Sequence, residues 1–110
     1  MSIVYTLDEI KSRVMPILEK YRIPAMYLFG SYARGNATKN SDIDFLIDTT
    51  GTDLTFLLRL GALYCDLEEE FQKPIDLITV GAIMQESTME SDVDFRNTVL
   101  RERVRLDDVA

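Results

Sequence analysis

The sequence predicts a single mixed α/β domain over residues 1–110, with a small mixed β-sheet flanked by helices. A chain of 110 residues is long enough for one hydrophobic core and too short for two. Hydrophobic residues make up 46% of the chain and charged residues 28%, which is the composition of a folded globular protein. Apolar residues recur at helical spacing in some segments and alternate as in strands in others. Helices and strands should therefore pack together in two or three layers.

The predicted elements follow in the order helix, strand, strand, helix, strand, helix. Three short apolar segments are predicted strands, at residues 25–29, 42–48 and 75–80. Three longer segments with helical periodicity are predicted helices, at residues 7–21, 54–72 and 91–103. A short tail follows the last helix.

Local signals define the ends of these helices. Thr6 and Glu9 have the spacing of a capping box at the start of the first helix. Pro16 should kink that helix or divide it into two abutting segments. Leu57 is expected to face inward from the second helix, and Ser91 is expected to cap the third.

Charge and residue content exclude several functional classes. Lys and Arg total 12 against 19 Asp and Glu, so the net charge is −7. Direct nucleic-acid binding is not expected, because it requires clustered positive charge. The single cysteine and the lack of histidine exclude a disulfide framework, a Ser-His-Asp triad and a His-ligated zinc site. Any catalysis must use carboxylates, hydroxyls, backbone amides or a hard metal ion.

The sequence predicts a cytoplasmic protein without membrane contact. Residues 1–21 are charged throughout and have no apolar core of signal-peptide length. The most apolar stretch, residues 54–65, is interrupted by Arg59 and is too short to span a bilayer.

Asp42 and Asp44 are the first candidate for a chemical site. Residues two apart on a strand share a face, so the two carboxylates should project side by side, roughly 6.6 Å apart at the backbone. Two like charges about 4 Å apart repel by about 4 kcal/mol at an effective dielectric constant of about 20. A divalent cation removes that repulsion, and oxygen ligands with open positions for water and phosphate suit Mg²⁺. The alternative is a pair of solvated acids at the end of a strand.

Gly30 and Ser31 are a candidate phosphate-binding turn. They follow an apolar strand directly, where a glycine lets phosphate approach the backbone and a serine offers a hydroxyl and an N–H. The alternative is an ordinary turn. Gly30 and Gly35 also have the spacing of a P-loop, but Asn36 and Ala37 stand where its lysine and hydroxyl residue are required.

Residues 28–35, with the sequence LFGSYARG, together with Asp42 and Asp44 resemble the signature of the DNA-polymerase-beta-like nucleotidyltransferases. The short chain is similar to the minimal nucleotidyltransferase (MNT) branch of that superfamily. The resemblance implies transfer of a nucleoside monophosphate from an NTP, with ATP as the expected substrate, to an acceptor hydroxyl with release of pyrophosphate. It also implies a partner, because many MNT proteins are antitoxins encoded beside a HEPN-domain toxin, and some adenylylate a tyrosine of that toxin.

The resemblance implies a third carboxylate on an adjacent strand, and Asp76 fits. Asp42, Asp44 and Asp76 would then hold one or two Mg²⁺ ions, with Asp76 on the acceptor side activating the hydroxyl.

The resemblance also implies roles for residues around the phosphates. Gly30 and Ser31 would cradle the β- and γ-phosphates. Arg34 would clamp a phosphate or acceptor group, or else it is an outward-facing helix charge. Lys39 would assist as a mobile cation, or else it is solvated.

The sequence thus favours a Mg²⁺-dependent nucleotidyltransferase that acts as an antitoxin. Because 110 residues leave no room for a second domain, the acceptor or the base pocket is expected from another chain, and a homo-oligomer stays open. One alternative is a non-catalytic module that neutralises a toxin by covering it. Another is nucleotide transfer to a small molecule.

Overall fold

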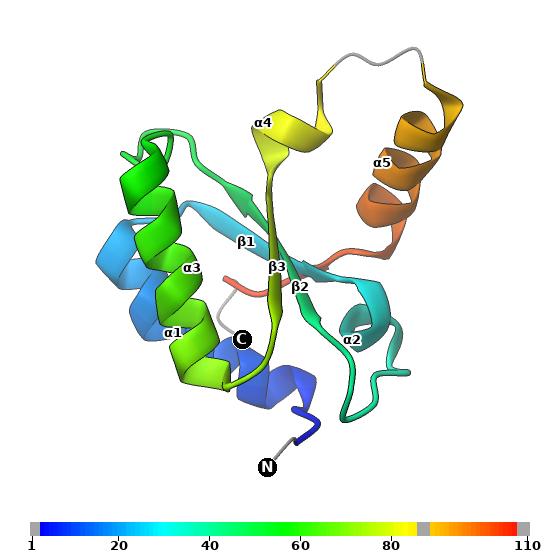
Figure 1. The fold of residues 1–110 in the computed structure, drawn as a ribbon, viewed down its shortest axis with the longest axis horizontal. Coiled ribbons are helices and arrows are strands. Elements are labelled where there is room, and N and C mark those ends of the chain that lie inside the picture. The colour runs from blue at the N-terminus through cyan, green and yellow to red at the C-terminus, as the bar shows by residue number, and fades with distance from the viewer. Residues whose placement is uncertain (1–2, 86–88, 108–110) are drawn as a thin grey trace.

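A computed structural model describes residues 3–85 and 89–107 and has a four-stranded mixed sheet with helices on both faces (Figure 1). The strands are β1 (Ala25–Phe29), β2 (Ile43–Asp48), β3 (Ile75–Thr79) and β4 (Val104–Arg105). The helices are α1 (Leu7–Tyr21), α2 (Gly30–Arg34), α3 (Leu57–Phe71), α4 (Val80–Ile83) and α5 (Glu90–Glu102). The predicted mixed α/β class is confirmed. No helix in the described part of the chain is long and apolar enough to cross a membrane.

The strand order is β3-β2-β1-β4, so β2 is an inner strand. It pairs antiparallel with β1, where Phe29 lies opposite Asp44, and parallel with β3, where Asp44 lies opposite Asp76. Phe29, Asp44 and Asp76 therefore form one row across the sheet. This register places Asp44 at the centre of that row.

The two faces of the sheet are covered differently. Ile43, Phe45 and Ile47 of β2 are fully buried in a large core cluster to which α1 and α3 contribute. Figure 1 shows these two helices side by side on one side of the sheet. Leu46 points to the other face and belongs to a smaller cluster formed with Val99 of α5 and residues near α4.

Helix α1 begins at the predicted capping box. The backbone N–H of Glu9 donates to Thr6 Oγ1 at 3.1 Å, and the Thr6 N–H donates to Glu9 Oε1 at 2.9 Å. The helix continues through Pro16 as one element, so of the two predicted alternatives, a kink or a division into two abutting segments, the division is wrong. Pro16 and Ser12, whose carbonyl the proline leaves without an intrahelical donor, are both exposed, so water can satisfy that carbonyl.

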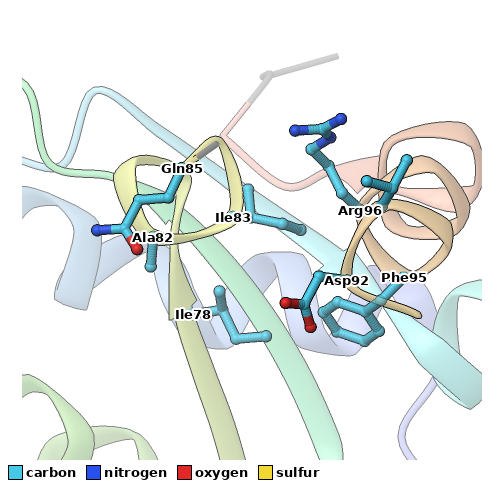
Figure 2. A pocket seen from close by; sticks show the side chains of 8 residues that line it. Ile78, Ala82, Ile83, Gln85, Asp92, Phe95 and Arg96 are labelled. Carbon is cyan, nitrogen blue, oxygen red and sulfur yellow. The ribbon is translucent and has the colours of Figure 1, made fainter. Parts of the chain in front are cut away.

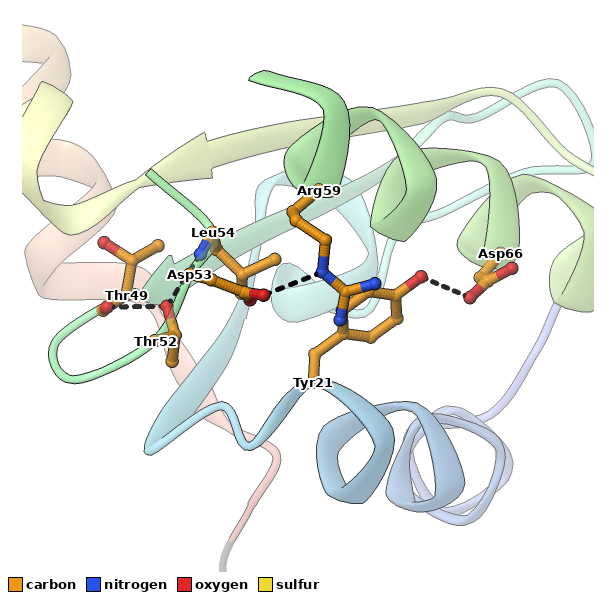
Figure 3. A network of polar contacts seen from close by, with 7 residues as sticks. All are labelled: Tyr21, Thr49, Thr52, Asp53, Leu54, Arg59 and Asp66. Atoms are coloured by element: carbon orange, nitrogen blue, oxygen red, sulfur yellow. Dashed lines mark hydrogen bonds and ion pairs between the residues drawn. The ribbon is translucent and has the colours of Figure 1, made fainter. Parts of the chain in front are cut away.

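Helix α3 begins later than predicted, because residues before it form a turn. Thr52 Oγ1 donates to the Thr49 carbonyl at 2.7 Å and accepts from the Leu54 N–H at 3.1 Å (Figure 3). This turn places Leu54 in the core at 1% exposure and leaves Leu57 84% exposed. The expectation that Leu57 faces inward is therefore wrong.

A polar network holds α1 against α3 beside that turn (Figure 3). The Tyr21 hydroxyl donates to Asp66 Oδ2 at 2.6 Å, and the Arg59 guanidinium lies 4.8 Å from the centre of the Tyr21 ring. Arg59 Nε also donates to Asp53 Oδ2 at 3.0 Å. The network fixes the start of α3 relative to the end of α1.

Two short elements extend the predicted order near the C-terminus. Helix α4 follows β3 directly, with the Thr79 hydroxyl accepting from the Ala82 N–H at 3.1 Å. Strand β4 adds a fourth strand by pairing antiparallel with β1, where a tail was predicted. Helix α5 begins at Glu90 with Met89 as its N-cap, so the prediction that Ser91 caps it is wrong.

Candidate active site

Asp44 lies directly against the backbone of Gly30. Gly30 begins α2 with φ +71°, a left-handed conformation that favours glycine. A Cβ at this position would collide with Asp44 Oδ2 and would lie 3.0 Å from Asp44 Cγ. Position 30 therefore requires glycine for its backbone conformation and also for the carboxylate beside it.

Asp42 and Asp76 flank Asp44. Asp42 immediately precedes β2, Asp76 lies opposite Asp44 in β3, and both residues are exposed, whereas Asp44 is half-buried. Burial, the negative charges of Asp76 and Asp42, and a hydrogen bond shared with Asp76 raise the pKa of Asp44 from 3.8 to about 6. The fold thus brings together the three acids that the sequence singles out.

This arrangement concentrates negative charge at one point of the sheet. Across residues 3–85 and 89–107, no group of three or more His, Cys, Asp or Glu side chains has the spacing of a preformed metal cage. Mg²⁺ rarely uses such a cage, since it binds through one or two carboxylates together with water and substrate phosphates. The oxygen donors and their mutual repulsion therefore fit a divalent cation that arrives with a nucleotide.

Helix α2 starts beside these acids. Its N-cap residue, Phe29, makes no side-chain hydrogen bond to the first turn, so the turn's N–H groups receive no side-chain cap there. Ser31, the second residue of the helix, is half-buried next to Gly30. The helix ends at Gly35, which has φ +78° and whose N–H donates to the Ser31 carbonyl.

Arg34 joins α2 to α5. Its Nη1 donates to Glu102 Oε2 at 3.1 Å, and the positive charge of Arg34 lowers the pKa of Asp44 against the larger effects that raise it. Arg34 is therefore an exposed helix residue that is also close enough to influence the central carboxylate.

Lys73 contributes to the site in a way that sequence reasoning did not find. Only 6% of this residue is exposed, and its Nζ donates to the backbone carbonyls of Ile3 at 2.8 Å and Lys39 at 2.9 Å. These bonds fasten the loop that leads into Asp42. The Lys39 side chain is exposed, so its carbonyl holds the loop while its ammonium group faces solvent.

Known proteins are similar to this chain in sequence. A family described as "Polymerase beta, Nucleotidyltransferase" matches residues 12–103. The protein adenylyltransferase MntA of Thermococcus cleftensis is 33% identical over 103 residues, covering 90% of this chain and 94% of that protein. The protein MJ0435 of Methanocaldococcus jannaschii is 38% identical over 78 residues, covering 70% of this chain and 81% of that protein.

A solved structure supports the same fold. A chain in the crystal structure of a toxin–antitoxin with AMP-PNP superposes with a TM-score of 0.66 at 22% identity, covering 90% of this chain and 73% of that one. The family match confirms the resemblance that was based on residues 28–35 together with Asp42 and Asp44. This chain therefore belongs to the polymerase beta nucleotidyltransferase family and is an enzyme of the nucleotidyltransferase class.

Proposed function

We propose that this protein is a Mg²⁺-dependent adenylyltransferase that moves AMP from ATP to a tyrosine hydroxyl of a HEPN-domain toxin and thereby acts as its antitoxin. The observation that carries the proposal is the contact of Asp44 with Gly30, with Asp42 and Asp76 on either side. A triphosphate bound at the start of α2 would meet carboxylates from two adjacent strands. One bound nucleotide could then contact both the phosphate-binding turn and the carboxylates that would hold the metal.

Asp42 and Asp44 would hold one or two Mg²⁺ ions, with Asp76 as the third ligand on the acceptor side. When bound, the metal would neutralise the triphosphate and lower the pKa of the acceptor hydroxyl. Gly30 and Ser31 would hold the β- and γ-phosphates through backbone N–H groups and the serine hydroxyl.

In the reaction itself, the acceptor oxygen would attack the α-phosphorus of ATP. A new P–O bond would form to the acceptor, and the bond between the α-phosphorus and the β-bridging oxygen would break to release pyrophosphate. Asp76 is exposed, so its carboxylate can take the proton of the acceptor hydroxyl. The carboxylate would then release this proton to water. Arg34 would stabilise charge on a phosphate once its bond to Glu102 exchanges.

Two observations support a protein acceptor. MntA of Thermococcus cleftensis is a protein adenylyltransferase, and the AMP-PNP structure with the same fold is a toxin–antitoxin. Phe56, Leu57 and Leu58 are consecutive, and they are 67%, 84% and 90% exposed. Exposed apolar clusters of this kind mark protein–protein contacts, so a toxin partner would cover this surface.

Label transfer tests the proposal directly. The purified protein is incubated with Mg²⁺, ATP labelled on the α-phosphate and the product of the toxin gene beside its own. We expect label on the toxin, lost when the tyrosines of the toxin are changed to phenylalanine. Absence of label with every NTP would contradict the proposed transfer.

Matched variants separate chemistry from simple covering of the toxin. Asp42→Ala with Asp44→Ala should abolish label transfer and protection of cells. Asp48→Ala should retain both, because Asp48 lies on the same strand as Asp44 but its side chain bonds only to Thr50 among the described residues. Full protection by a folded double variant would instead identify a non-catalytic binder.

A further inference from the structure

A pocket lies between α4 and α5 on the face of the sheet that carries the carboxylates. Its volume is about 330 Å³, which is at the lower end of the range of small-ligand sites. Ile78 of β3, Ile83 of α4, and Asp92 and Phe95 of α5 are among the residues that line it. Figure 2 shows the Asp92 carboxylate and the Phe95 ring turned toward the gap opposite Ile78 and Ile83.

The strand register places this pocket next to the candidate active site. Ile78 follows Asp76 by two residues in β3, so the two side chains share a face and lie roughly 6.6 Å apart along the strand. The Phe95 ring makes an edge contact with the Phe29 ring at 6.2 Å between centroids, and Phe29 lies opposite Asp44 in the sheet. The edge of the pocket at Ile78 is therefore roughly 6.6 Å from Asp76 along the strand, a separation that a ribose can bridge.

We propose that this pocket binds the base of the nucleotide, and that it favours a base with an exocyclic amino group. The inference rests on the proposed nucleotidyl transfer and adds the subsite that recognises the substrate. Ile78 and Ile83 offer an apolar surface to one side of a planar ring, and Phe95, which is 48% exposed, offers its own ring to the other.

Asp92 supplies the acidic group of this recognition, beside the polar side chains of Gln85 and Arg96 that also line the pocket. A carboxylate only accepts hydrogen bonds, and its two oxygens can accept several at once, so Asp92 can pair with an amino group such as that of adenine beside any other contact that it makes. It repels the carbonyl oxygen that uracil carries instead. Of the two parts expected from another chain, the acceptor or the base pocket, a partner would then need to supply only the acceptor.

Binding measurements on the full chain test the subsite apart from catalysis. Dissociation constants for Mg²⁺ with ATP, UTP and tripolyphosphate are measured by calorimetry. Phe95→Ala should weaken ATP binding about tenfold or more, which is typical of losing an aromatic platform, and should change tripolyphosphate binding less than twofold. Asp92→Asn should reduce the preference for ATP over UTP.

Phe56→Ala is the matched control, because Phe56 is also an exposed aromatic residue but lies at the start of α3, on the opposite side of the sheet. It should leave all three dissociation constants unchanged, because the exposed surface to which Phe56 belongs is assigned to the toxin and not to the nucleotide. Phe95→Leu replaces Phe95→Ala if the contact with Phe29 proves necessary for folding, as judged by circular dichroism. Equal ATP affinity in the Phe95 and Phe56 variants, or equal affinity of the wild type for ATP and UTP, would overturn the proposal.

The result separates this subsite from the proposed function. ATP binding that depends on Phe95, without label transfer to a toxin, would leave the base pocket standing and refute only the acceptor. A Phe95 variant that binds ATP normally but no longer binds the toxin would identify the pocket as a protein contact and overturn its assignment to the base.

Discussion

The two faces of β2 differ in chemistry: one face carries buried apolar side chains and the other carries Asp44. Ile43, Phe45 and Ile47 point into the large cluster beneath α1 and α3 and are fully buried. Asp44, between the first two, points to the opposite face, where its ionised form is disfavoured by burial and by neighbouring charge. Packing on one face of the strand can thus offset the unfavourable approach of acids on the other.

The largest expected effect comes from breaking the packed face. Phe45→Ala removes a fully buried ring that packs against Phe71 at 5.9 Å between centroids. We expect a loss of about 3–5 kcal/mol in the free energy of unfolding, because the lost transfer energy and the remaining cavity add together. Urea denaturation followed by circular dichroism measures this loss.

Phe56→Ala is the control for that measurement. The Phe56 side chain is 67% exposed, so its removal should change the free energy of unfolding by less than about 0.5 kcal/mol. Equal losses in the two variants would show that the face beneath α1 and α3 is not the main source of stability.

The next effect tests the contact between Gly30 and Asp44. Gly30→Ala and Gly35→Ala both place a side chain in a left-handed conformation, at φ +71° and +78°, which costs about 1–2 kcal/mol each. Only the alanine at position 30 would also collide with Asp44, since a Cβ at Gly35 meets no atom of the described chain within 4 Å.

Gly30→Ala should therefore lose label transfer almost completely, whereas Gly35→Ala should lose only the about 1–2 kcal/mol of the left-handed conformation and retain transfer. The rate of transfer and the urea midpoint, measured on the same preparations, distinguish the two losses. Equal transfer by both variants would mean that the position of Asp44 against Gly30 is not required.

The third effect is a dependence of stability on pH that has opposite signs at two positions of β2. The pKa of Asp44 is raised to about 6, so the folded state holds its proton more tightly than the unfolded state does. The stability contributed by this group is present below pH 4 and is lost as the pH rises to about 6. The full shift corresponds to about 3 kcal/mol, but Asp44 is only half-buried and solvent screens part of the effect. Asp44→Asn should therefore be more stable than the wild type at pH 7, by about 1 kcal/mol, and equal to it near pH 4.

Asp48→Asn supplies the opposite sign. Hydrogen bonds from the side chain and backbone of Thr50 lower the pKa of Asp48, so its stabilising contribution is present at neutral pH and is lost as the pH falls through that pKa. This variant should be less stable than the wild type at pH 7. Unfolding is followed in EDTA between pH 3 and 8, and a gain of stability in both variants at pH 7 would contradict the electrostatic contrast between the two positions.

Sequence periodicity was sufficient to predict the strand that has the two contrasting faces and a helix that packs against one of them. Alternation along residues 42–48 predicted which side chains of β2 share a face, and the capping box predicted the start of α1. It was insufficient wherever distant segments meet. The two residues of β4 are too few to show a period, and the turn that exposes Leu57 depends on hydrogen bonds of Thr52 rather than on hydrophobicity.

The candidate site shows the same division. Asp42 and Asp44 are predictable from local spacing, since residues two apart on a strand share a face. The place of Asp76 depends on strand pairing across α3, and only the family resemblance indicated it. The buried Lys73 had no sequence signal, because a lysine is ordinarily exposed and its partners here are backbone carbonyls far away in the chain.

The smallest expected effect concerns Arg34, which connects α2 to α5 beside the carboxylates. Arg34→Ala and Glu102→Ala break the same partly exposed ion pair, so each should cost less than about 1 kcal/mol of unfolding free energy. Only Arg34→Ala also removes the positive charge that lowers the pKa of Asp44. In Arg34→Ala, the loss of stability that accompanies ionisation of Asp44 should therefore shift to a higher pH. In Glu102→Ala it should not shift. Equal shifts in the two variants would mean that Arg34 acts only by holding α5, and that its charge does not reach the carboxylates.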